Sequence, residues 1–137
     1  MPTVLVVDDY EPFRKFVCSI LQNTDGLRLV GEASDGLEAV RKSEQLQPDL
    51  ILLDIGLPSL NGIEAARQMR KTSPNSKILF CSVDSSAEVI EEALGAGAWG
   101  YIVKSRAATE LSEALEAAIL GTQFGGTPGP AVTRLPV

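Results

Sequence analysis

The chain has 137 residues, of which 45% are hydrophobic, enough for the core of one globular domain. Its net charge of −6 argues against a large nucleic-acid interface, and its complete lack of histidine excludes an imidazole as general base, zinc ligand or phosphoryl carrier. No stretch forms a secretory signal or approaches the roughly 20 apolar residues of a membrane span. We therefore expect a soluble, cytoplasmic protein that binds neither membranes nor nucleic acids.

Short apolar segments alternate with segments of helical periodicity along most of the chain. The apolar segments predict five strands, at residues 4–7, 27–33, 50–53, 78–81 and 100–103. Because each connection is long enough for a helix, the strands are expected to run parallel, with helices on both faces of the sheet. The predicted fold class is α/β, a doubly wound (βα)5 sandwich built on a five-stranded parallel sheet.

The segments between the strands carry apolar residues three and four positions apart, the spacing of one helix face. These residues are Phe13, Phe16, Val17, Ile20 and Leu21 in the first segment, Leu37, Val40 and Leu46 in the second, Ile63, Ala66 and Met69 in the third, and Leu111, Ala114, Leu115, Ala118 and Ile119 in the last. Two capping pairs, Asn61 with Glu64 and Ser85 with Glu88, predict the starts of the third and fourth helices.

The end of the chain differs in composition from the rest. Residues 122–137 are rich in glycine and proline and show no periodicity. We therefore expect one domain over residues 1–121, followed by a flexible tail over residues 122–137.

Polar side chains follow four of the five predicted strands. Asp8 and Asp9 come directly after the first strand, Asp54 after the third, Ser82 at the end of the fourth and Lys104 after the fifth. The C-terminal ends of parallel strands share one edge of the sheet, and open α/β sheets bind ligands at that edge. The sequence therefore predicts that three carboxylates, one hydroxyl and one ammonium meet at a single crevice.

The chemistry of these groups points to a metal ion and a phosphoryl group. A set of carboxylates suits Mg²⁺, which prefers oxygen ligands. An oxygen of Asp54 is able to attack phosphorus and form an acyl phosphate. Lys104 and Mg²⁺ would neutralise the transferring phosphoryl oxygens, and Ser82 would donate a hydrogen bond to them.

Four stretches of the sequence together resemble the receiver domain of two-component response regulators, over about residues 3–120. They are "VDD" at residues 7–9, "LLDIGLPSLNG" at residues 52–62, Ser82, and "GAWGYIVK" at residues 97–104. The last stretch, followed by Ser105, is most similar to receivers of the NarL/FixJ type. The resemblance implies a CheY-like, flavodoxin-like fold with strand order 2-1-3-4-5.

The resemblance also implies roles for individual residues. Asp54 would accept the phosphoryl group from a sensor histidine kinase. Asp9, Asp54 and the Gly56 carbonyl would bind Mg²⁺ directly, and Asp8 would act through water. The chain would catalyse its own phosphoryl transfer and dephosphorylation without being a turnover enzyme.

Signal output is also implied by the resemblance. Ser82 and Tyr101 would form the switch pair that rearranges on phosphorylation, and the face made by the fourth helix, fifth strand and fifth helix would bind an effector protein or a second copy. Receivers of the NarL/FixJ type usually precede a helix-turn-helix domain. Since only a short tail follows here, we expect no DNA-binding output domain in this chain.

Three positions depart from the common receiver pattern. Ser82 replaces threonine, Val83 stands where a small alanine is usual, and Ser105 replaces the proline that often follows the lysine. Val83 is expected to narrow access to Asp54.

Two alternative functions are less consistent with the sequence. A phosphatase of the haloacid dehalogenase type would need a second acid two residues after Asp54, where Gly56 stands. A pseudo-receiver would be a protein-binding module that is never phosphorylated, but such proteins usually lack part of the acidic trio or the lysine.

The "GAGAWG" stretch at residues 95–100 fits a dinucleotide-binding sequence pattern. It is followed by a predicted strand, whereas the dinucleotide-binding motif is followed by a helix whose N-terminus binds the pyrophosphate.

Overall fold

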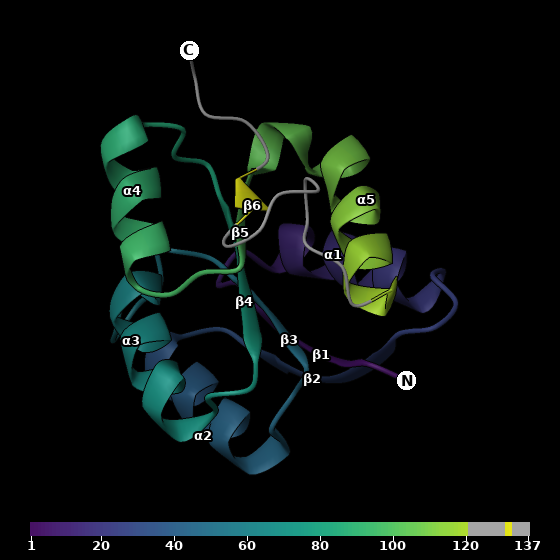
Figure 1. Ribbon diagram of the computed structural model, residues 1–137, viewed down its shortest axis with the longest axis horizontal. Coiled ribbons are helices and arrows are strands. Elements are labelled where there is room, and N and C mark those ends of the chain that lie inside the picture. Colours follow the sequence, from purple (N-terminus) through teal and green to yellow (C-terminus); the bar gives the residue numbers. More distant parts are fainter. Residues whose placement is uncertain (121–130, 133–137) are drawn as a thin grey trace.

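A single parallel sheet with helices on both faces forms the molecule (Figure 1). The computed structural model describes residues 1–120 and 131–132. Within them the strands follow the order β2-β1-β3-β4-β5-β6. Their bounds are β1 (Thr3–Val7), β2 (Arg28–Ala33), β3 (Leu50–Leu53), β4 (Lys77–Ser82), β5 (Gly100–Val103) and β6 (Ala131–Val132).

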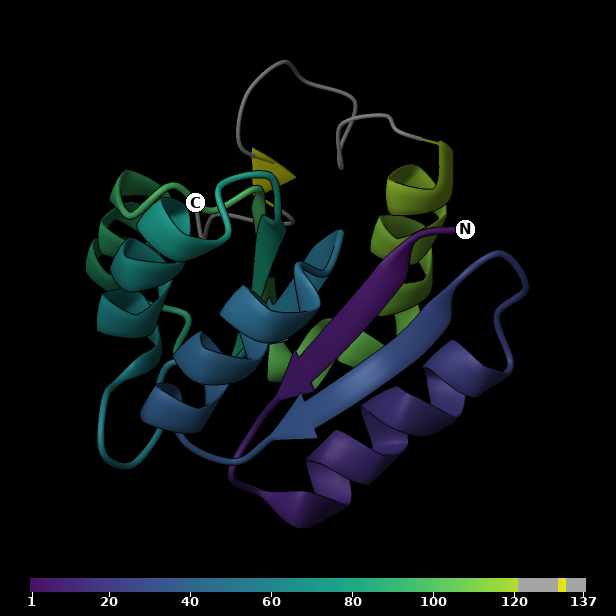
Figure 2. The ribbon, with the colours of Figure 1, turned by 90° about the horizontal axis from the view of Figure 1, so that it is seen from below.

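The helices divide between the two faces of this sheet. Their bounds are α1 (Glu11–Gln22), α2 (Gly36–Leu46), α3 (Gly62–Thr72), α4 (Ala87–Gly95) and α5 (Ala107–Leu120), with a 3₁₀ turn η1 (Lys104–Arg106) before α5. Helices α1 and α5 cover one face, and α2, α3 and α4 cover the other (Figures 1 and 2).

The alternation of side chains along the central strands explains why these strands are apolar throughout. Val4 and Val6 of β1 pack on the side of α1 and α5, whereas Leu5 and Val7 pack on the side of α2, α3 and α4. Both faces of β1 and β3 are therefore buried, and each face has its own hydrophobic cluster.

The predicted five-stranded parallel sheet and its order 2-1-3-4-5 are confirmed. The described residues add one strand at the edge, because β6 pairs in parallel with β5 through Gly100↔Ala131 and Tyr101↔Val132. This two-residue strand is too short to give a periodic signal in the sequence. The remainder of the predicted flexible tail lies outside the described residues.

The predictions for α1, α2 and α4 each contain an error. In α1, Phe16 is expected on the apolar face but is 40% exposed. The cap of α4 is Ser86, whose side chain accepts a hydrogen bond from the Val89 N–H, and not Ser85. In α2, Leu37 is 54% exposed, and Leu46 is exposed as well. The buried face of α2 consists of small residues because the helix lies close to α3 and to the loop after β3: a Cβ on Gly36 would stand 1.8 Å from the Leu60 carbonyl oxygen.

The "GAGAWG" stretch forms the end of a helix and a turn, as its position before a strand predicts. Helix α4 ends at Gly95, and Gly97 has a φ of +96°, a conformation that favours glycine. The stretch then enters β5 at Gly100. It therefore does not provide the helix N-terminus that a bound pyrophosphate requires.

The start of α3 holds the loop after β3 in place. Asn61 caps this helix by accepting the Glu64 N–H, as predicted, and the Gly62 N–H donates to the Ile55 carbonyl oxygen at 2.8 Å. A Cβ on Gly62 would lie 2.0 Å from the carbonyl oxygen of Asp54. Only glycine allows the helix to begin this close to Asp54.

Replacing Gly62 with alanine is therefore expected to destabilise the fold by about 3 kcal/mol, because backbone atoms on both sides would have to move. Gly95→Ala is the matched control, since a Cβ there meets nothing within 4 Å. Chemical denaturation of both variants measures the effect. Equal unfolding midpoints for the two would show that the loop tolerates the extra methyl group.

Candidate functional site

The C-terminal ends of β1 and β3 bring three carboxylates together. Asp8, Asp9 and Asp54 each offer an oxygen, and these oxygens all lie within 4.8 Å of one another. The sheet hydrogen bonds set this placement, because the Asp54 N–H donates to the Val7 carbonyl oxygen at 3.0 Å and the Asp8 N–H donates to the Ala33 carbonyl oxygen at 3.1 Å. The predicted convergence of the acidic residues is thus a property of the strand register.

Lys104 enters this cluster from the end of β5. Its Nζ lies 2.8 Å from Asp8 Oδ2 and 3.4 Å from Asp54 Oδ2. The ammonium also lies 4.5 Å from the centre of the Phe13 ring on α1, a cation–π contact. Burial alone would lower the pKa of Lys104, but the interactions with the two aspartates outweigh it and raise that pKa above its ordinary value. Lys104 is therefore a fixed positive charge in the site.

Asp54 lies at the base of the cluster with only 7% of its surface exposed. Burial raises the pKa of Asp54, and the negative charge of Asp8 raises it further. Lys104 and the Ile55 N–H, which donates to Asp54 Oδ1 at 2.8 Å, oppose this rise. The charge of one lysine does not fully offset the neighbouring carboxylates, so the site favours an additional cation.

The two adjacent aspartates have different surroundings. Asp8 is buried and accepts a hydrogen bond from the Tyr10 N–H at 2.9 Å, in addition to its ion pair with Lys104. The Arg14 guanidinium donates to the Asp8 carbonyl oxygen at 2.8 Å and fixes the backbone here. Asp9 is exposed. Asp8 is thus already engaged by protein groups, whereas Asp9 faces the solvent side of the cluster.

Above the carboxylates lies an open cleft of about 460 Å³. Its lining residues are Asp9, Tyr10, Phe13, Asp54, Ile55, Gly56, Ser82, Val83, Asp84 and Lys104. Val83 is 77% exposed at this cleft, at the position where the sequence predicts restricted access. Val83 and Tyr10 therefore line the same cleft as Asp54.

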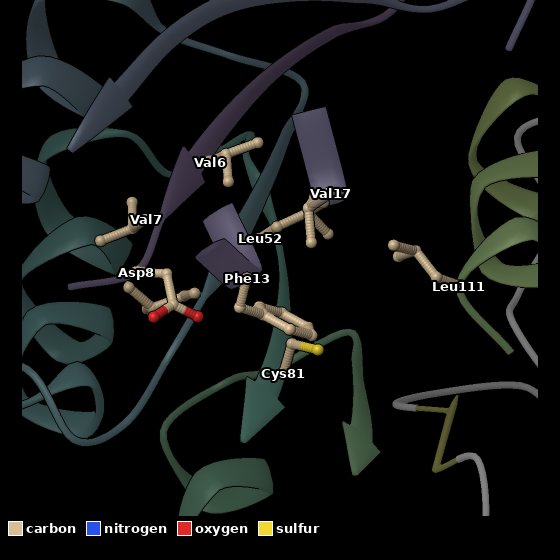
Figure 3. A pocket seen from close by; sticks show the side chains of 9 residues that line it. Val6, Val7, Asp8, Phe13, Val17, Leu52, Cys81 and Leu111 are labelled. Carbon is tan, nitrogen blue, oxygen red and sulfur yellow. The ribbon is translucent and has the colours of Figure 1, made fainter. Parts of the chain in front are cut away.

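Beneath the carboxylates the interior is apolar and nearly filled. A cavity of about 10 Å³ separates Asp8 from side chains that include Phe13, Val17 and Cys81 (Figure 3). This is at most the space of one water molecule. Burial raises the pKa of Cys81 to about 12, so its thiol stays protonated and is no nucleophile for the site above it.

The two predicted switch residues contact each other through their side chains, and both also contact the backbone of a third residue. Ser82 Oγ accepts a hydrogen bond from the Asp84 N–H at 3.3 Å, and the Tyr101 hydroxyl donates to the Asp84 carbonyl oxygen at 2.7 Å. The Tyr101 ring is 1% exposed and lies 6.2 Å from the ring of Phe80. The segment after β4 thus connects the floor of the cleft with the side chain of Tyr101.

The family model for the response regulator receiver domain matches residues 4–116, which include every element of this site. The chain belongs to this family.

Relatives and solved structures agree with this assignment. The receiver is 39% identical to the chemotaxis protein CheY of Thermotoga maritima, over 82% of this chain and 92% of CheY. It is 34% identical to the response regulator GacA of Pseudomonas syringae pv. syringae, over 90% of this chain but only 58% of GacA. A two-component response regulator of the LuxR family from Aurantimonas sp. SI85-9A1 has a similar structure, with a TM-score of 0.83, 32% identity, and coverage of 90% of this chain and 88% of the other.

The donor groups of this receiver fit Mg²⁺. The three carboxylates supply hard oxygen ligands from one small region, and the neighbouring Gly56 has open space where a Cβ would stand. Thiol and imidazole ligands would favour a softer metal than Mg²⁺. Within the described residues, neither kind of ligand belongs to the carboxylate cluster. Among the same residues, no helix combines the length and the apolar character that a membrane crossing demands.

Sequence reasoning missed three contributors to the site of this receiver. Phe13 covers Lys104, Arg14 holds the backbone of Asp8, and Asp84 joins Ser82 to Tyr101. Phe13 belongs to an apolar stripe on the first helix. The sequence pattern of that stripe is the same whether the Phe13 ring packs in the core or contacts a lysine ammonium. Asp84 contacts Ser82 and Tyr101 through its backbone atoms, so the type of its side chain does not reveal this role.

Proposed function

We propose that this receiver accepts a phosphoryl group on Asp54 from a sensor histidine kinase, in a reaction that depends on Mg²⁺. The observation that carries the proposal is the position of Asp54: it is buried at the base of an open cleft, 3.4 Å from the Lys104 ammonium and beside two further carboxylates. Membership of the receiver family supports the same role.

In the transfer step, an oxygen of the Asp54 carboxylate attacks the phosphorus of the donor. The new oxygen–phosphorus bond forms as the phosphorus–nitrogen bond of the donor phosphohistidine breaks, and the imidazole leaves with the electron pair. The Ile55 N–H holds one carboxylate oxygen at 2.8 Å and thereby fixes the orientation of the nucleophile. The product is an acyl phosphate on Asp54.

Charge stabilisation comes from groups that already surround Asp54. The Lys104 ammonium is placed to neutralise a phosphoryl oxygen. Ser82 accepts the Asp84 N–H and also hydrogen-bonds with the Tyr101 side chain, so its hydroxyl group would have to turn to donate its proton to a second phosphoryl oxygen. Bound Mg²⁺ would supply further positive charge to these oxygens, held by Asp9, Asp54 and the Gly56 carbonyl, with Asp8 acting through water.

Phosphorylation would then change the α4–β5–α5 face. A hydroxyl of Ser82 drawn toward the phosphoryl group would alter its contact with Asp84, and Asp84 is also the partner of the buried Tyr101 hydroxyl. Because phosphorylation shifts an equilibrium only by interacting differently with the two states, these new contacts supply the driving force. We propose that the altered face binds an effector protein or a second copy of the chain.

Incubation with acetyl phosphate and Mg²⁺, followed by intact mass measurement, tests the proposed function. We expect a mass increase of one phosphoryl group that is lost when EDTA replaces Mg²⁺. An unchanged mass would favour the alternative, a pseudo-receiver that binds proteins without being phosphorylated. Continuous release of phosphate from unrelated phosphate esters would instead indicate a turnover phosphatase.

Mg²⁺ alone is expected to stabilise the folded chain, because only the folded state assembles the three carboxylates. At ten times the dissociation constant the gain is about 1.4 kcal/mol, and the melting temperature should rise by roughly 4–6 °C. Asp9→Ala should weaken Mg²⁺ binding more than Asp8→Ala, since Asp8 is already engaged by Lys104 and Tyr10. Thermal melts over a Mg²⁺ titration measure both effects.

The control for this titration is Asp35→Ala, which removes an aspartate that caps α2 outside the cluster. Its melting temperature should respond to Mg²⁺ as the unmodified chain does. A melting temperature that is insensitive to millimolar Mg²⁺ in the unmodified chain would contradict the metal site.

A further inference from the structure

The edge of the sheet beside β5 is covered by a segment from far along the same chain. Ala131 and Val132 form β6, which pairs in parallel with β5 at Gly100 and Tyr101. Figures 1 and 2 both place β6 beside β5, at the edge of the sheet between α4 and α5. This contact lies on the α4–β5–α5 face, which we propose changes on phosphorylation.

The backbone of β5 makes this edge a site for strand addition. On one side β5 pairs with β4, from Leu79↔Gly100 to Ser82↔Val103. Without β6, the other edge of β5 would expose unpaired backbone N–H and C=O groups, and such an edge readily pairs with another extended segment. Strand β5, helix α5 and strand β6 form a β–α–β unit, and this connection accounts for the parallel direction of β6.

The sequence around β6 limits the strength of this pairing. Pro130 directly precedes Ala131 and Pro136 follows four residues after Val132, so a longer ladder would meet residues without an N–H group. Two residue pairs yield few hydrogen bonds, while the cost of ordering the segment remains. Such a strand is held largely by its covalent attachment, which keeps its local concentration high, and a competing segment is able to displace it.

We propose that the β5 edge is a docking site for an extended peptide segment, and that Ala131–Val132 of the same chain occupies it in cis. The occupied edge is withheld from an extended segment of a partner protein until β6 leaves. Because Val132 pairs with Tyr101, the proposed switch residue, the state of the edge and the state of the switch are coupled. The coupling to the switch rests on the proposed function, whereas the occupancy of the β5 edge by β6 does not.

The test compares amide hydrogen exchange in the full, unphosphorylated chain and in the double variant Ala131→Pro/Val132→Pro. Prolines at both positions remove the N–H groups of β6. We expect the edge-side amides of residues 100–103, resolved individually by NMR, to exchange roughly threefold faster or more in the variant. A synthetic peptide of residues 127–137, added in excess to the variant, should restore their protection.

The control is Ala131→Thr/Val132→Ile, which keeps β-forming residues and their N–H groups and should retain the slow exchange. Equal exchange in the proline variant and the unmodified chain would overturn the proposal. Protection that grows with protein concentration would also overturn it, because the segment would then dock on a second copy. No phosphoryl donor is present, so the outcome is independent of whether Asp54 is phosphorylated.

Discussion

Replacing Asp54 with asparagine is expected to abolish phosphorylation by acetyl phosphate, the largest single effect that the site predicts. The amide keeps the size of the side chain but lacks the anionic oxygen that attacks phosphorus. It also removes one of the three carboxylates that favour a metal ion. Intact mass after incubation with acetyl phosphate and Mg²⁺ should show no added phosphoryl group.

Asp84→Asn provides the matched control for this variant. Asp84 lines the same cleft, but hydrogen bonds from Ser86 lower the pKa of its carboxyl group, which is the opposite direction from Asp54. This variant should gain one phosphoryl group as the unmodified chain does. A phosphorylated Asp54→Asn protein would show that another residue is the acceptor.

Removing Lys104 is expected to separate phosphorylation from switching. Lys104→Ala leaves the Asp54 nucleophile in place, so the chain should still accept phosphate, but more slowly by roughly 10²-fold because one charge-stabilising group is lost. Since Lys104 lowers the pKa of Asp54, its loss should raise that pKa further. The rate defect should therefore grow as the pH falls and a larger fraction of Asp54 becomes protonated.

The switching defect of Lys104→Ala is measured by hydrogen exchange over residues 84–112, with and without beryllofluoride. The unmodified chain should change its protection across this region, and the variant should not. Lys77→Ala is the control, because Lys77 lies at the start of β4 with its ammonium 5.6 Å from the Trp99 ring, away from the carboxylates. A Lys104→Ala variant that responds like the unmodified chain would remove Lys104 from the switch.

The positions of the site residues could be predicted because they depend on strand ends. Buried parallel strands are marked by uninterrupted apolar runs, and the first polar residue after each run marks the edge of the sheet. Asp8, Asp54 and Lys104 meet for this reason, with Lys104 Nζ 2.8 Å from Asp8 and 3.4 Å from Asp54. The resemblance supplied the roles of Gly56 and Tyr101, which no strand-end argument identifies.

Other features depend on contacts that local sequence patterns do not encode. Leu37 follows the spacing of a buried stripe, but α2 packs through small residues against α3 and the loop after β3, so Leu37 faces solvent. Strand β6 has two residues and depends entirely on the unpaired edge of β5. Asp84 contacts Ser82 and Tyr101 through its backbone atoms, so this role depends on where Tyr101 and Ser82 lie in space.

Localisation of the phosphoryl group tests the central claim most directly. Borohydride reduces an acyl phosphate to an alcohol, so treatment of the phosphorylated chain followed by peptide mass mapping marks the residue that carried the phosphoryl group. The account predicts homoserine at position 54 and unmodified aspartate at positions 8, 9 and 84. Reduction at any of those three positions, or a phosphoryl group that survives borohydride on a serine or threonine, would contradict it.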